Sequence, residues 1–173
     1  MEQARTSLTV QAERQGLVEI TGKVAAWLAG ETVGDGLLTV FIRHTSASLL
    51  IQENVDTDVQ RDLESFLKKL VPESDTGYRH DAEGPDDMPA HIKGALTQTH
   101  LSIPVSAGRL MLGRYQGIFL FEHRRSPRPR EIVLHLVGQK SSPSSRRPDS
   151  RGSDPRLSEA EWRDLVPTTS RKS

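Results

Sequence analysis

Short alternating or continuous apolar runs dominate the first 138 residues of the chain. They predict strands over residues 7–13, 37–45, 48–53, 101–105, 110–112, 117–123 and 132–137. Short turns join many of these runs, and two or three helical segments interrupt them. The pattern predicts an α+β fold built on a mostly antiparallel sheet.

The helical segments have apolar residues at a spacing of three and four. Residues 20–28 predict a short helix, and residues 54–70 predict the longest one. Asp56 is placed to cap the long helix, because a short side-chain oxygen can accept a bond from a free amide of the first turn. Its predicted packing stripe is Val55, Val59, Leu63, Phe66 and Leu70.

A third helix is predicted from Asp87 onward. Asp87 is the expected cap, and Pro89 is tolerated in a first helical turn because the amide there has no helical partner. Met88, Ile92 and Leu96 then share one face, which we expect to pack against the sheet.

The composition changes after Gly138. Residues 139–173 are rich in Ser, Pro, Arg and Asp, and such a segment buries too little apolar surface to offset the entropy of ordering. We therefore expect one domain at 1–138 and a disordered tail at 139–173. Within the tail, residues 158–165 have the capping and apolar spacing of a short helix, around Trp162.

Charge and cysteine content exclude several classes of protein. The formal net charge is zero, so no overall field attracts nucleic acid or an anionic membrane. The chain has no cysteine, which excludes disulfides, zinc–thiolate sites and cysteine nucleophiles. The first ten residues are too polar for a signal peptide, and no apolar run has the length of a bilayer. We expect a cytoplasmic protein without nucleic-acid or membrane partners.

Three of the six histidines lie in three different predicted elements. His44 ends a strand, His80 lies in a loop and His91 lies on the third helix. A catalytic zinc site uses three protein ligands, so these imidazoles are candidate ligands. Their spacing matches no short zinc motif, and a single histidine is more often a structural or surface residue. That second interpretation is the one we expect for His100, His123 and His135.

Acidic and polar residues supply further candidates. Asn54 and Asp56 follow a strand and open a helix, where capping and a role in a site use the same residue types. Glu122 shares a strand face with apolar residues, and a buried carboxylate must be paired or functional. Arg124 and Arg130 are its candidate partners, so a buried salt bridge and a catalytic role both stay open.

The hydroxyl-rich residues 44–48 join two strands, and Ser46 and Ser48 there can bind phosphate oxygens or simply form a turn. A serine-hydrolase elbow is absent from the sequence. The three glycines of residues 108–117 lack the strand–loop–helix context of a nucleotide site, so they are expected to bend strands or form turns.

Four long segments carry a resemblance to a known family. They are HTSASLLIQENVDTDV at 44–59, YRHDAEGPDDMPAHIKGAL at 78–96, SIPVSAGRLMLGRYQGIFLFEHR at 102–124 and REIVLHLVG at 130–138. On these segments the chain resembles the YjbQ family of secondary thiamine-phosphate synthases, from about residue 8 to residue 138. It departs from that family at Arg114-Tyr115, where relatives usually have Thr-Trp, so substrate choice or packing is expected to differ there.

The resemblance implies a compact α+β domain with a curled antiparallel sheet that assembles as a homotrimer. It also implies a polar pocket, between subunits, lined by the matching histidines and acids. The implied reaction joins a hydroxymethylpyrimidine pyrophosphate to a thiazole phosphate, as a secondary activity. Because no Asp-rich magnesium motif is present, three histidines favour a transition metal over magnesium.

The leading hypothesis is therefore a transferase of the thiamine-phosphate synthase type, active in thiamine biosynthesis. It expects a divalent metal, zinc first and magnesium second, on His44, His80 and His91. Catalytic roles are expected for Asn54, Asp56 and Glu122. A small phosphorylated substrate would be held by Ser46, Ser48, Lys93, Arg124 and Arg130. The alternatives are a metal-dependent hydrolase of a small phosphorylated substrate and a non-catalytic trimer that binds a small anion.

Overall fold

The computed structural model describes residues 1–73 and 77–140. Along the chain, these residues form β1 (Glu2–Val10), β2 (Gly16–Glu19), α1 (Thr21–Ala29), β3 (Val33–Ile42), β4 (Ala47–Glu53), α2 (Thr57–Leu70), α3 (Asp87–Leu96), β5 (His100–Ser106), β6 (Arg109–Leu110), β7 (Gln116–Glu122) and β8 (Arg130–Lys140).

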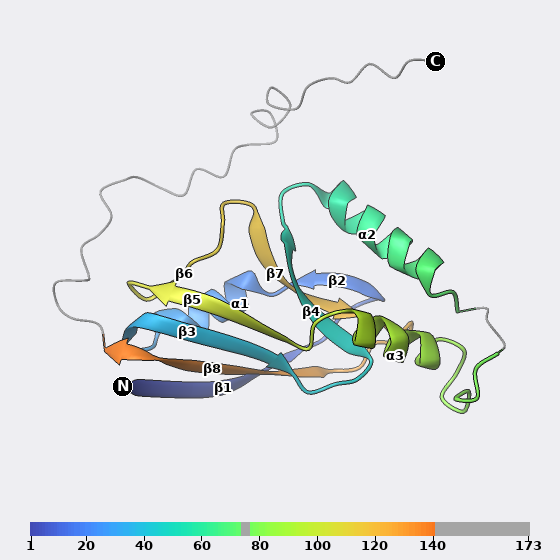
Figure 1. The fold of residues 1–173 in the computed structure, drawn as a ribbon, viewed down its shortest axis with the longest axis horizontal. Helices are drawn as coiled ribbons and strands as arrows, with labels where there is room; N and C mark the ends of the chain where they lie inside the picture. Colours follow the sequence, from blue (N-terminus) through green and yellow to red (C-terminus); the bar gives the residue numbers. More distant parts are fainter. Residues whose placement is uncertain (74–76, 141–173) are drawn as a thin grey trace, which may run out of the picture.

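The described strands form two sheets, and all their pairings are antiparallel (Figure 1). The larger sheet has the order β1-β8-β3-β5-β6, and the smaller has the order β2-β7-β4. The predicted α+β fold with a curled antiparallel sheet is confirmed. Strand β7 of the small sheet and strand β8 of the large one follow each other in the chain, so the short connection between them joins the two sheets.

Alternation along the central strands builds the core. Val40 pairs with Leu134 across β3 and β8, and both side chains are buried. Every second residue of β8 from Arg130 to Leu136 is likewise buried, which is the period of a strand with one face on the core. The buried side of α1, with Val24 and Leu28, belongs to the same apolar cluster.

Several strands differ from the expected ones. Strand β1 covers Glu2–Val10 rather than residues 7–13. Strand β2 was missed, because only four residues pair there. Strand β3 ends at Ile42, so His44 lies in the connection to β4 rather than in the strand. Strand β8 continues to Lys140, two residues past the expected domain end, because its last residues pair with the start of β3.

Helix α2 is capped by Asp56 as predicted, but it begins at Thr57 rather than at residue 54 and packs differently. The Asp56 carboxylate accepts a hydrogen bond from the Asp58 amide at 2.8 Å, which confirms the cap. The predicted packing stripe is wrong at its C-terminal end, where Phe66 is 60% exposed and Leu70 is 55% exposed. Val59 and Leu63 of the stripe are half-buried, and Leu67 is the buried residue of the helix. The helix is instead tied to β2 by Glu64, which accepts from the Leu17 amide at 2.8 Å.

Helix α3 buries two charged residues, whereas Met88 and Ile92 of its predicted apolar face are only half-buried. Asp87 is the first helical residue rather than the cap, and Leu96 is 59% exposed. Asp87 and Lys93 are buried, and charged partners offset the cost of that burial. Gly94 allows α3 to lie close to the backbone of Thr45, because a Cβ at position 94 would lie only 2.8 Å from the Thr45 carbonyl oxygen.

None of the helices in residues 1–73 and 77–140 is long and apolar enough to cross a membrane. The predicted tail from residue 141 onward, including the possible short helix at 158–165, lies outside the described residues.

Candidate functional site

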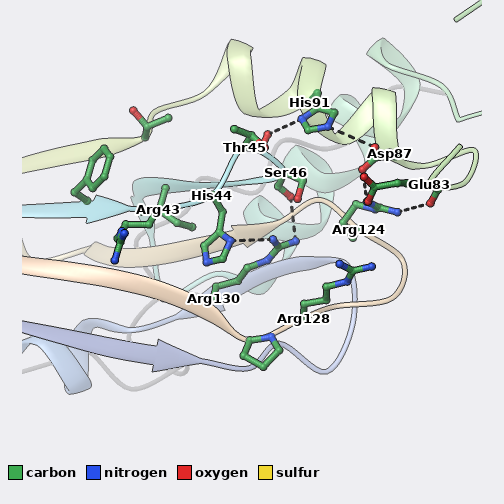
Figure 2. Close-up of a pocket in the computed structure, with 14 residues that line it drawn as sticks. Arg43, His44, Thr45, Ser46, Glu83, Asp87, His91, Arg124, Arg128 and Arg130 are labelled. Atoms are coloured by element: carbon green, nitrogen blue, oxygen red, sulfur yellow. Dashed lines mark hydrogen bonds and ion pairs between the residues drawn. The ribbon is translucent and has the colours of Figure 1, made fainter. Parts of the chain in front are cut away.

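A cavity of about 650 Å³ opens where the connections after β3 and β7 meet helix α3 (Figure 2). Its charged lining comes from four arginines and two carboxylates, so positive charge is in excess. Such a volume is that of a typical small-molecule site. The charged and imidazole side chains on its wall are Arg43, His44, Glu83, Asp87, His91, Arg124, Arg128 and Arg130.

A buried ion pair holds Arg130 on the cavity wall. The Arg130 guanidinium donates to both oxygens of Glu122, from Nε to Oε2 at 2.7 Å and from Nη2 to Oε1 at 2.6 Å. Glu122 is fully buried and Arg130 nearly so. Because both carboxylate oxygens are engaged, Glu122 is a positioning residue for Arg130, and the salt-bridge interpretation of Glu122 fits this geometry.

His44 presents a donor to the same cavity. Its Nε2 accepts the backbone amide of Glu131 at 2.8 Å. Burial, followed by the nearby Arg130 charge, lowers the pKa of His44 below its ordinary 6.5, so the ring is neutral at pH 7. A neutral ring that accepts at Nε2 carries its proton on Nδ1. That N–H lies 3.5 Å from Nη1 of Arg130, so two donors stand side by side, as an anion requires (Figure 2).

Asp87 connects the cationic wall to two histidines. Its Oδ1 is in a short ion pair with Nη1 of Arg124, whose Nε also donates to Asp86 at 3.0 Å. The other oxygen, Oδ2, lies 2.7 Å from Nε2 of His80 and 3.5 Å from Nε2 of His91. The side-chain ligand atoms of His80, Asp87 and His91 lie within 4.8 Å of one another.

The donor chemistry of this group fits a divalent cation. Nδ1 of His91 lies 3.2 Å from the Thr45 carbonyl oxygen, which accepts only if that nitrogen carries the proton. The Nε2 lone pair then faces Asp87, so two acceptors confront each other, and a proton or a cation between them relieves the repulsion. Fixing a ligating imidazole through its other nitrogen is the usual arrangement in metal sites. Two imidazoles and a carboxylate suit zinc or a similar transition metal.

The predicted metal set is only partly brought together. His80 and His91 are neighbours, with ring centroids 5.4 Å apart. His44 lies outside their group in the described structure, and its Nε2 is occupied by a backbone amide. Asp87 takes the third place. Asp87 and His91 are four residues apart, so they lie on the same side of a helix, and this spacing could have predicted the pair. It was overlooked because Asp87 was interpreted as a helix cap.

The predicted phosphate-binding residues divide between two places. Ser46, Arg124 and Arg130 line the large cavity. Lys93 lines a second cavity, under α2, together with His123. Ser48 is buried, and its Oγ lies 2.9 Å from Nε2 of His123.

His123 was expected at the surface or in a sheet, and it is fully buried directly after β7. Burial, and then the positive charges of Lys93 and Arg130, lower the pKa of this imidazole to about 3. It is therefore neutral at any physiological pH.

Neither Asn54 nor Asp56 lines the large cavity. Asp56 caps α2, and Asn54 lines a third cavity near residues 108–116, where its amide donates to Glu19 at 3.3 Å. These contacts favour structural roles for both residues over the predicted catalytic ones.

Two arginines of the large cavity were missed by sequence reasoning. Arg43 pairs with Glu131 at 3.0 Å, and Arg128 is an exposed residue in the connection between β7 and β8. Nothing in their immediate sequence distinguishes them from ordinary surface arginines. They line one cavity only because the fold brings the connection after β3 and the connection after β7 together.

Comparison with known proteins points to one family. Residues 6–139 match the model of the UPF0047 protein YjbQ-like family. The UPF0047 protein sll1880 of Synechocystis is 50% identical over 132 residues, which are 76% of this chain and 90% of that protein. The UPF0047 protein YjbQ of Escherichia coli O157:H7 is 42% identical over 134 residues, which are 77% of this chain and 96% of that protein.

Solved structures give the same result. The conserved hypothetical protein TT1486 of Thermus thermophilus aligns with a TM-score of 0.69 at 40% identity, over 76% of this chain and 99% of its own. The YbjQ-like protein of unknown function SSO2532 of Sulfolobus solfataricus has a TM-score of 0.73 at 24% identity, over 80% and 99%. The latter likeness concerns the fold alone.

Replacing Glu122 should lower the free energy of unfolding far more than replacing an exposed carboxylate that pairs with another arginine. Glu122→Gln leaves the Arg130 charge buried without a counter-ion, which should cost about 3–5 kcal/mol of unfolding free energy. Glu131→Gln is the matched control, because its pair with Arg43 is exposed and should contribute less than about 1 kcal/mol. Urea unfolding of both variants measures the difference, and equal losses would contradict the role given to the buried pair.

The depressed pKa of His123 predicts loss of stability in acid. The unfolded imidazole takes up a proton below pH 6.5, whereas the folded one resists protonation down to a pH of about 3, so stability falls as the pH drops through this window. Between pH 7 and pH 5 the wild type should lose about 2 kcal/mol more than His123→Asn. Urea unfolding at both pH values tests this, with His100→Asn as an exposed control. Parallel losses in wild type and His123→Asn would refute it.

Proposed function

The chain belongs to the UPF0047 YjbQ-like family, and we propose that its large cavity binds a small phosphorylated substrate beside a divalent cation. The observation that carries the proposal is the convergence of four arginines and the His44 N–H on a cavity whose wall includes Asp87 and His91. Phosphate oxygens are acceptors, and guanidinium groups are their best-matched donors.

The specific reaction that we propose is formation of thiamine phosphate, as the resemblance implies. The C–O bond of the pyrimidine pyrophosphate breaks, and pyrophosphate leaves with the electron pair. The ring nitrogen of the thiazole phosphate forms the new C–N bond at the same methylene carbon. Negative charge grows on the leaving pyrophosphate, so preorganised cations beside it lower the barrier.

Different residues of the cavity would bind the phosphates and the metal ion. Arg130 is fixed by Glu122 and can donate through Nη1 and Nη2 without losing its Nε bond, while the His44 N–H adds a neutral donor next to it. Arg128 stands on the exposed rim, where it can meet a second phosphate. His80, Asp87 and His91 would hold zinc or a related ion, which supplies further charge stabilisation for phosphate oxygens.

A metal-dependent hydrolase of a phosphorylated substrate is the second candidate. The same cations would bind its substrate, and three protein ligands leave a position open on a catalytic metal ion. The two candidates differ in the acceptor of the organic group, which is the thiazole nitrogen in one and water in the other. Product analysis separates them.

We also propose the homotrimer that the resemblance implies. Exposed apolar side chains support an assembly of copies of this chain: Leu37 is 47% exposed and Phe41 is 44% exposed on β3, and Phe66 and Leu70 are exposed on α2. Clustered exposed apolar surface commonly marks an interface. Phe41 also lines the large cavity, so a partner seated on this face of β3 would lie beside the site.

Zinc binding should depend on the group of His80, Asp87 and His91. Apo protein titrated with zinc should bind one equivalent per chain, and His80→Ala should lose that site because one of three ligands is gone. His100→Ala, which removes an exposed imidazole from β5, is the control and should bind as the wild type does. Stoichiometric zinc retained by His80→Ala at equal affinity would refute the assignment.

Turnover should require the rim arginine. Zinc-loaded protein given both phosphorylated precursors should form thiamine phosphate and pyrophosphate in equal amounts. Arg128→Ala should lower kcat/KM by about tenfold or more, because a charged hydrogen bond to phosphate is lost. Arg61→Ala, a surface arginine on α2, is the control.

The products decide between the candidates. Release of pyrophosphate or phosphate without thiamine phosphate would favour the hydrolase. Saturable substrate binding with no product of either kind would leave an anion-binding protein and would contradict both enzymatic proposals.

A further inference from the structure

The third cavity, of about 350 Å³, lies where helix α1 faces strand β6 (Figure 1). Its volume is within the range of small-molecule sites. It shares none of its lining residues with the large cavity or with the cavity under α2. It is therefore a separate place at which the protein can hold a ligand.

Much of the wall of this cavity is apolar. Leu28 of α1 lines it and is 2% exposed, as a member of the main apolar cluster. Leu110 and Leu112 also line it, and they pack partly buried against the same cluster. Ala25 and Ala29 complete the α1 side, where their short side chains leave space. A hydrocarbon chain placed here would lose contact with water, which is favourable.

Among the described residues, the charged ones that line the cavity are Arg109 and Arg114. Two carboxylates lie close to the wall without lining it. Glu19 accepts the Thr21 hydroxyl at 2.8 Å and the Asn54 amide at 3.3 Å, and both of these donors belong to lining residues.

The other carboxylate, Asp35, accepts from Ser106 and Ala107, just before Arg109 in the chain. Donors of the protein therefore engage both carboxylates, and the charges on the cavity wall are the two guanidinium groups.

The connection that carries Arg114 is fixed by Gln116. The Gln116 side-chain oxygen accepts the Gly113 amide at 2.8 Å, and the Gln116 amide donates to the Gly113 carbonyl at 3.0 Å. The central guanidinium carbon of Arg114 lies 5.5 Å from the centroid of the Tyr115 ring. A guanidinium over an aromatic face is stabilised there, so this contact helps to orient the Arg114 charge.

Arg109 follows a turn that is held in an uncommon conformation. Ala107 has a φ of +50° and Gly108 one of +73°, and a left-handed conformation is uncommon for alanine. Asp35 stabilises the turn, because one carboxylate oxygen accepts the Ser106 hydroxyl at 2.7 Å and the Ala107 amide at 3.0 Å. Such strain persists where the surrounding structure fixes it, often beside a ligand. The backbone at Arg109 is thus preorganised.

We propose that this cavity binds an amphipathic organic anion, with a carboxylate or phosphate head on Arg109 and Arg114 and an apolar chain against Leu28, Leu110 and Leu112. The planar guanidinium matches the oxygens of both head groups. It carries five N–H donors, so a contact with a protein neighbour still leaves donors for a ligand. This inference does not depend on the function proposed for the large cavity.

Octanoate and octyl phosphate are suitable probes, and octanamide is a neutral one with the same chain. Calorimetry on the full-length protein should give one saturable site per chain for at least one of the two anions, and the tighter anion identifies the head group. Octanamide should bind at least about tenfold more weakly than that anion, because it lacks the charge. Acetate should bind at least about tenfold more weakly than octanoate, because it lacks the chain.

A matched pair of variants on α1 locates the chain of the ligand. Ala25→Leu places a larger side chain in the cavity and should weaken binding of the tighter anion by about tenfold or more. Ala26→Leu is the control, because Ala26 is equally an exposed residue of α1 but does not line the cavity. It should bind as the wild type does.

A second set of variants locates the head group. The double variant Arg109→Gln with Arg114→Gln removes both charges and should weaken binding by about tenfold or more. Both arginines are exposed, so these changes should leave the fold intact, and thermal unfolding checks that they do. Arg128→Gln, in the large cavity, should leave octanoate binding unchanged.

Four outcomes would overturn the proposal. They are the absence of saturable binding of both anions, equal binding of octanamide and the tighter anion, undiminished binding by the folded double variant, and equal binding by Ala25→Leu and Ala26→Leu. Loss of octanoate binding in Arg128→Gln would place the ligand in the large cavity and would also contradict it.

Discussion

The buried pair of Glu122 and Arg130 is the interaction on which the site depends. Glu122 ends β7 in the small sheet and Arg130 begins β8 in the large one, so their two hydrogen bonds fasten the sheets together at one end. Glu122 also accepts the Arg124 amide at 2.9 Å, which directs the chain toward α3. Desolvating both charges is costly, and such a pair contributes specificity of arrangement rather than a large net stability. Here that arrangement is a guanidinium aimed into the cavity.

The rest of the site follows from two shared carboxylates. Asp87 engages Arg124 through one oxygen and two imidazoles through the other, so the cationic wall and the candidate metal ligands are set by one side chain. Asp86 helps to fix Arg124: burial would raise the pKa of this carboxyl, but hydrogen bonds from Arg125 and Arg124 lower it, so it stays charged. Placing donors and acceptors before a ligand arrives is what lets a polar site act on charge.

Much of this could be predicted from the sequence, and the misses have physical causes. The alternation of apolar and polar residues predicted the antiparallel fold. The pairing of Glu122 with an arginine could also be anticipated, because Glu122 lies on an apolar strand face and an unpaired buried carboxylate is unstable. Helical spacing failed for α3, where Asp87 and Lys93 face inward, because ion pairs formed with Arg124 and Glu73 from distant segments. Apolar spacing also failed to identify the buried face of α2, where Phe66 and Leu70 are exposed. Arg43 and Arg128 join the cavity only through tertiary contacts.

The most direct test of the central claim is a crystal structure of the full chain grown with zinc and inorganic pyrophosphate, with anomalous data at the zinc edge. Our account predicts a zinc peak bound by His80, Asp87 and His91, with pyrophosphate against Arg130 and the His44 Nδ1–H in the adjoining cavity. A zinc peak on His44 instead, or pyrophosphate bound away from Arg130, would contradict it.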